Sequence, residues 1–103
     1  MPLNNPSKAV EIKTGTYTGD DTVNRAIPHG LSKTPKLVLI IVDSARGVII
    51  GGEARLHSID AANQHHVVTA PDSTNFYVGN ATSYVQSCNT AGGGYTYRWV
   101  AMV

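Results

Sequence analysis

The feature that most constrains this chain is a run of six aliphatic residues, Leu37 to Val42, which Pro35 precedes and Asp43 follows. Four of the six are β-branched, and such residues favour an extended chain. The run is far shorter than the about 20 residues that a membrane-spanning helix needs. Because successive side chains of a strand point to opposite faces, this strand carries aliphatic side chains on both faces. We therefore expect one face to meet the domain core and the other to meet a second layer or another subunit.

Shorter segments of strand-like composition recur along the rest of the chain, separated by Gly, Pro, Asn and Asp turn signals. We expect further strands at residues 10–17, 22–27, 47–57, 65–70, 75–78, 84–88 and 95–103. Residues 10–27 are predicted to form a hairpin, and Gly51 with Gly52 a bulge or a close backbone approach within its strand. Trp99, the only Trp, is expected to anchor the core.

Helical periodicity is almost missing from the sequence. Residues 58–64 are the one candidate helix, and a loop suits them equally well. The pattern predicts an all-β fold, an antiparallel β-sandwich (jelly-roll or H-type-lectin-like) of about 6–8 strands.

A length of 103 residues corresponds to one domain. We place that domain at residues 10–103, after a short extended N-terminal arm at residues 1–9. The arm contains Pro2, Leu3 and Pro6 and has no core of its own. It is either a frayed terminus or an arm that docks on a neighbour.

Charge and cysteine content exclude several classes of protein. The net charge is +1, and the eight Lys and Arg residues form no basic run, which argues against nucleic-acid binding. The single Cys88 has no intrachain disulfide partner and is expected to be a small buried hydrophobe. The first residues lack the basic and apolar regions of a signal peptide, so we expect synthesis in a cytoplasm and no membrane association.

No catalytic or metal-binding motif stands out. His65 and His66 are adjacent, so in a strand they point to opposite faces and do not chelate one ion together. There is no nucleophile elbow, and the glycine run at 92–94 lacks the Lys-Ser/Thr of a phosphate-binding loop. We expect no catalytic residues, no cofactor and no metal.

Two parts of the chain resemble small bacteriophage virion proteins, which occur as head-associated proteins and as tail-fibre modules. The shared motifs are Gly-Thr-Tyr-Thr-Gly-Asp-Asp at 15–21, Arg-Ala-Ile at 25–27, Gly-Leu at 30–31, Thr-Pro-Lys-Leu-Val at 34–38, Gly-Tyr-Thr-Tyr at 94–97 and Trp-Val-Ala at 99–101. The layout is also similar to the H-type lectin sandwich, through Thr-Pro-Lys before the aliphatic run, Phe76, Trp99 and Ala101. The glycines at 51–52 and 92–94 depart from that family.

Both resemblances imply a homotrimer. We expect a non-enzymatic virion structural protein, a trimeric decoration or cementing protein bound to the major capsid protein or other virion proteins. The head is favoured over the fibre because the chain opens on its own Met1 and ends after the last strand. The expected subunit or capsid interface is Pro2, Leu3, Pro6, Val38, Ile40 and Val42, or the opposite face of the same strand.

The alternative is a tail-fibre or head-fibre tip that binds a host receptor or surface glycan. It predicts exposed aromatic and Asn-rich loops at one end of the domain. The candidate contact residues are Asn80, Tyr84, Asn89 and Tyr95.

Overall fold

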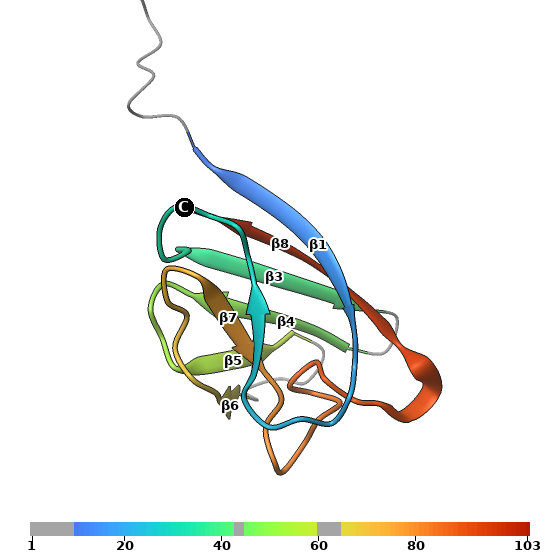
Figure 1. The fold of residues 1–103 in the computed structure, drawn as a ribbon. Coiled ribbons are helices and arrows are strands. Elements are labelled where there is room, and N and C mark those ends of the chain that lie inside the picture. The colour runs from blue at the N-terminus through green and yellow to red at the C-terminus, as the bar shows by residue number, and fades with distance from the viewer. Residues whose placement is uncertain (1–9, 43–44, 60–64) are drawn as a thin grey trace, which may run out of the picture.

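The computed structural model describes residues 10–42, 45–59 and 65–103, and they form an all-β fold in two antiparallel sheets (Figure 1). The eight strands found in these residues are β1 (Ile12–Thr18), β2 (Arg25–Pro28), β3 (Leu37–Val42), β4 (Ala45–Ile50), β5 (Arg55–Ser58), β6 (His65–Val67), β7 (Asn75–Val78) and β8 (Thr96–Met102). A single 3₁₀ turn, η2 (Gly92–Gly94), precedes β8. The predicted all-β sandwich is confirmed.

The larger sheet has the strand order β1-β8-β3-β4-β5-β6, and the smaller sheet pairs β2 with β7. Figure 1 shows β2 and β7 crossing one face of the larger sheet. The last strand therefore lies between β1 and β3, and it pairs with β1 over seven residues and with β3 over five. Because β8 pairs with β1, the first and last strands of the described chain are hydrogen-bonded to each other.

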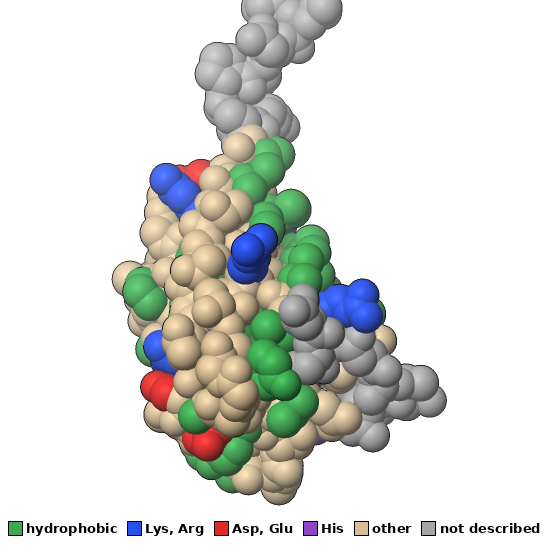
Figure 2. All heavy atoms as spheres, turned by 90° about the vertical axis from the view of Figure 1, so that its right-hand side faces the viewer, with side chains coloured by type: hydrophobic (Ala, Val, Ile, Leu, Met, Phe, Trp, Pro, Cys, Tyr) green, Lys and Arg blue, Asp and Glu red, His purple; other side chains and the backbone are tan. Residues whose placement is uncertain are grey.

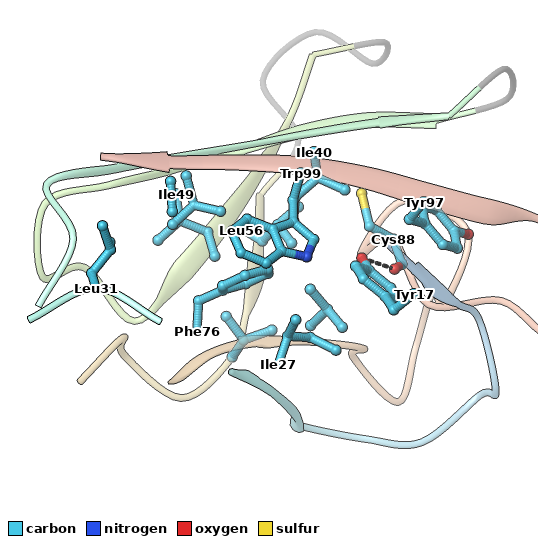
Figure 3. Close-up of a cluster of buried hydrophobic side chains, with 14 residues drawn as sticks. Tyr17, Ile27, Leu31, Ile40, Ile49, Leu56, Phe76, Cys88, Tyr97 and Trp99 are labelled. Atoms are coloured by element: carbon cyan, nitrogen blue, oxygen red, sulfur yellow. Dashed lines mark hydrogen bonds between the residues drawn. The ribbon is translucent and has the colours of Figure 1, made fainter. Parts of the chain in front are cut away.

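The core lies between the two sheets (Figure 3). Trp99 on β8 meets Phe76 on β7 edge to face, with ring centroids 5.3 Å apart. Tyr17 on β1 stacks on Tyr97 at 5.1 Å, and its hydroxyl donates a 2.6 Å hydrogen bond to the carbonyl of Cys88. The core role expected of Trp99 and the burial expected of Cys88 are both confirmed.

The aliphatic run forms β3 with the predicted bounds. Val38 and Ile40 face the core and are 1% and 0% exposed. Leu37, Leu39 and Ile41 face away from the smaller sheet, and Ile41 is 45% exposed. Within this chain, the second apolar face of β3 is therefore only partly covered.

The predicted hairpin at residues 10–27 is wrong. β1 pairs with β8, whereas β2 pairs with β7 in the other sheet. The connecting turn is held by the 79–90 loop, because Asp21 N donates to Asn89 O and Asn24 N donates to Gly79 O. The chain therefore crosses from one sheet to the other instead of folding back on β1.

Two other expected elements differ. Residues 47–57 form parts of two strands, because Gly51 has a φ of +57° and Glu53 N bonds Ile50 O to make a tight reversal. The expected bulge is thus a hairpin turn. The strand expected at 84–88 is a series of turns, in which Ser87 N bonds Ser83 O. Of the candidate helix, Ser58 ends β5, and 60–64 lie outside the described residues.

Candidate functional site

The main candidate surface is the outer sheet face, which we define as the side of the larger sheet that points away from β2 and β7. The register places its apolar side chains in cross-strand rows on β1, β8, β3 and β4. These residues are Ile12, Leu37, Leu39, Ile41, Val48, Ile50, Val100 and Met102. All are exposed or half-buried, so the rows form one continuous apolar surface.

The area of this surface is comparable to that of the largest apolar patch on a typical monomer, which is often functional. Four strands about 4.8 Å apart and six residues of about 3.3 Å rise make a flat area on the order of 400 Å². Monomers rarely expose apolar patches larger than a few hundred Å². Hydrophobic side chains also reach the surface as a band along the side of the molecule shown in Figure 2, beside Lys and Arg side chains.

The polar residues of the outer sheet face match those of protein interfaces. The same rows continue through Thr14 and Thr16 on β1, Arg98 on β8, Arg46 on β4, His57 on β5 and His65 on β6. Lys, Asp and Glu are absent from these paired positions, whereas Arg and Met are present. Interfaces are depleted in Lys, Asp and Glu and enriched in Arg and Met.

The β1 edge of the larger sheet carries an inward-pointing lysine. β1 is the outermost strand, and Lys13 pairs with the buried Ala101, so its side chain is on the core side of an open edge. Inward-pointing charges on edge strands discourage edge-to-edge pairing. Association of copies through the outer sheet face is therefore favoured over strand addition at β1.

The structure places part of the expected subunit interface elsewhere. Val38 and Ile40 are enclosed in the core of this chain, and Val42 is half-buried and packs against it. Val38 and Ile40 are unavailable to a partner because the smaller sheet and its loops cover that face. The opposite face of β3, which the sequence left open, is the available one. Pro2, Leu3 and Pro6 lie outside the described residues.

Two residues of the expected glycan loop serve the fold instead. Asn89 is fully buried; its Nδ2 donates to Asp20 Oδ1 (3.0 Å) and Thr22 O (2.8 Å), and its Oδ1 accepts from Arg25 Nη1 (3.2 Å). Asn80 holds its own loop, with Nδ2 donating to Val67 O and Oδ1 accepting from Thr82 N. Their amides are committed to the protein, so Asn89 is corrected to a structural residue.

The two tyrosines of that set do not join them in one site. Tyr84 is half-buried in the 79–90 loop, where its carbonyl accepts from Asn89 N at 2.8 Å. Tyr95 lies one residue before β8 and lines a pocket of about 430 Å³ with Ile41, Val42, Gly94, Thr96 and Arg98. Arg98 was not among the candidates predicted from the sequence. The one feature that could have indicated it is that a charged residue stands at an outward position of the last strand.

The two adjacent histidines point to opposite faces of β6, as the sequence predicts. His65 is exposed and His66 buried, so they point to opposite faces. His29 is buried, with Nδ1 accepting from Leu31 N and Nε2 bonded to Asp72 O. His66 Nε2 is buried without a hydrogen-bond partner. Within residues 10–42, 45–59 and 65–103, three or more metal-ligating side chains do not converge anywhere.

Among the carboxylates that the structure describes, Asp72 in the turn before β7 has the most strongly shifted pKa. Its Oδ1 accepts from Asn75 N (2.7 Å) and Thr74 N (2.9 Å), and its Oδ2 accepts from Tyr77 OH (2.8 Å). These bonds, the one from Asn75 foremost, hold the pKa of Asp72 well below its usual range. The carboxylate organises the turn through these hydrogen bonds, so we assign it a structural role.

Comparison of the chain with protein-family models, with curated proteins and with solved structures gives no significant match. The resemblance to virion proteins thus rests on the motifs alone. In the described part of the chain, no helix is long and apolar enough to span a membrane.

Proposed function

We propose that this chain is a non-enzymatic structural protein that works by association of its outer sheet face, and that it is a bacteriophage virion component. The assembly proposed is a homotrimer that decorates or cements the capsid. The observation that carries the proposal is the outer sheet face itself, an apolar surface with Arg, Met and His and without Lys, Asp or Glu at its paired positions.

A second copy of this chain is the occupant we propose for the outer sheet face. Interfaces between copies are more apolar than those between independent proteins. The apolar rows supply on the order of 400 Å², and the rims on β5 and β6 extend the face toward the roughly 800 Å² that each partner buries in a standard interface. Packing around a threefold axis would cover Leu39 at the centre of the rows.

The association is tested by measuring the mass of the protein in solution with light scattering. We expect three times 10.9 kDa for the wild type. Ile50→Asp places a charge on the outer sheet face at a residue that is 50% exposed, so it should fold and remain monomeric. Ala26→Asp, at an exposed position on β2 in the other sheet, is the matched control and should remain trimeric.

Three outcomes would contradict the proposal. A wild-type monomer at every concentration would overturn association through this face. A mass of two chains would overturn the trimer. An Ile50→Asp protein that is folded by circular dichroism and still trimeric would move the interface elsewhere.

The virion location is tested separately, by the copy number of this protein in purified virions relative to the major capsid protein. Hundreds of copies at a fixed ratio would support decoration. A handful would support the second candidate, a receptor- or glycan-binding fibre tip, which the pocket beside Tyr95 favours. Complete absence from virions would overturn both virion assignments.

A further inference from the structure

The pocket beside Tyr95 lies in a notch of the larger sheet. The last pair between β3 and β8 is Ile41 with Arg98, whereas β8 continues to pair with β1 as far as Thr96. On the β3 side, the first residues of β8 therefore have no strand partner among the described residues. The resulting pocket of about 430 Å³ falls in the range of small-molecule sites, about 300–1,000 Å³.

Among the residues that the structure describes, Arg98 is the only charged one that lines this pocket. It makes no ion pair with any residue that the structure describes, and none of those residues brings a carboxylate to the pocket. A planar guanidinium presents paired donors that match the two oxygens of a carboxylate. The charge of the pocket therefore selects an anion.

Tyr95 supplies a flat aromatic surface whose position is fixed. Its main-chain carbonyl accepts a 3.2 Å hydrogen bond from Gly19 N. Its ring lies against Gly93, where a Cβ would come within 3.1 Å of Cε2 and Cζ. The positive φ of Gly93, +82°, places the main chain close enough to support the ring. A ring held in this way offers a preformed face to the C–H groups of a ligand.

Thr96, Ile41 and Val42 also line the pocket. Thr96 and Arg98 are two residues apart on β8, so their side chains lie on one face about 7 Å apart. The Thr96 hydroxyl donates and accepts hydrogen bonds, as ligand hydroxyls require. Ile41 and Val42 line the notch from opposite faces of β3. One cation, one hydroxyl, one aromatic side chain and two aliphatic side chains at the notch suit a compact ligand that carries a carboxylate, hydroxyls and an apolar C–H face.

We propose that the notch between β3 and β8 is a binding pocket for a carboxylated sugar, with its carboxylate on Arg98 and its ring on Tyr95. A phosphate is a poorer fit, because one guanidinium offers few donors to a dianion and the Gly94 N–H is already bonded to Ala91 O. The proposal gives a ligand class to the second candidate function. Ile41 and Arg98 belong to both the outer sheet face and the notch, so a ligand in the notch and a second copy packed over these two residues exclude each other.

The test is titration of the ¹⁵N-labelled full chain, followed by NMR, with methyl glucuronide as the probe. Methyl glucoside is the neutral control, and acetate and inorganic phosphate report binding of a simple anion. We expect methyl glucuronide to shift the amide signals of Tyr95, Thr96 and Arg98, and to bind at least about tenfold more tightly than the other three compounds.

Three variants locate the binding. Arg98→Gln should weaken methyl glucuronide binding about tenfold or more, and Arg98→Lys, which keeps the charge but loses the planar fork, should restore only part of it. Arg55→Gln, at an exposed arginine on β5, is the matched control and should bind as the wild type does. The spectrum of each free variant shows whether it folds.

Any of four results would overturn the proposal. These are no binding of methyl glucuronide at millimolar concentration, equal binding of methyl glucoside, equal binding of acetate, and unchanged binding by a folded Arg98→Gln chain. Repeating the titration with Ile50→Asp separates the two proposals. Binding that persists in a monomeric Ile50→Asp chain supports the pocket, whatever the oligomeric state of the wild type.

Discussion

Gly15 on β1 faces Trp99 on β8, and a Cβ placed on Gly15 would lie 2.6 Å from Cζ2 of the indole. The largest side chain of the core therefore packs directly on the main chain of an edge strand. Any side chain at position 15 would push the indole into Phe76, which it meets edge to face. The pairing of the two strands and the filling of the core thus depend on one missing methyl group.

Gly15→Ala should destabilise the protein by about 1–3 kcal/mol, the usual range for overpacking a core. The loss should outweigh the gain of up to about 1 kcal/mol that Ala brings by restricting the unfolded chain. Urea unfolding measures the difference. Thr16→Ala, exposed on the same strand, is the control and should change stability little. Equal stability of Gly15→Ala and the wild type would mean that the indole has room to move.

Tyr17→Phe should lower the free energy of unfolding by about 1 kcal/mol or more, because it removes the buried hydrogen bond to Cys88 O. Burial of the phenol foremost raises the pKa of Tyr17, so the hydroxyl stays protonated as the donor. Tyr84→Phe is the control, since it removes a tyrosine hydroxyl from a half-buried loop position. The same loss in both variants would count against a specific role of the bond.

Asn89→Ala should cost more than either substitution above, because it removes the amide that joins residues 20–25 to the 79–90 loop. Two part-buried acceptors and Arg25 lose a partner, at about 1 kcal/mol for each hydrogen bond removed. Thermal unfolding checks the loss, with exposed Thr82→Ala as the control in the same loop. A variant as stable as the wild type would reopen a ligand-contact role for Asn89.

Asp72→Asn should weaken the dependence of stability on acid. The lowered pKa of Asp72 means that the folded state favours the carboxylate, so this contribution is present above the ordinary Asp pKa of about 4 and is lost as the pH falls toward the lowered value. At pH 7 the variant should be less stable than the wild type, and the difference should shrink below about pH 4. Urea unfolding between pH 2 and 7 measures it, and parallel curves would contradict the assignment.

The sequence by itself determined the local structure of this protein. Unbroken β-branched residues made β3 extended, and alternation along the last strand set Tyr97, Trp99 and Ala101 inward. Both patterns are readable because neighbouring residues alone decide which way successive side chains point. The all-β class and the second apolar face of β3 follow from them.

The tertiary structure alone decided which strands pair and which polar residues are free. Residues 10–27 have the composition of a hairpin, yet contacts with Asn89 and Gly79, some 55 to 70 positions away, send β1 and β2 into different sheets. Asn89 and Tyr95 look alike as candidate contacts in the sequence, but one amide is buried and bonded and the other side chain lines a pocket. Strand pairing and the burial of polar side chains depend on contacts between segments distant in the chain, and local composition does not predict those contacts.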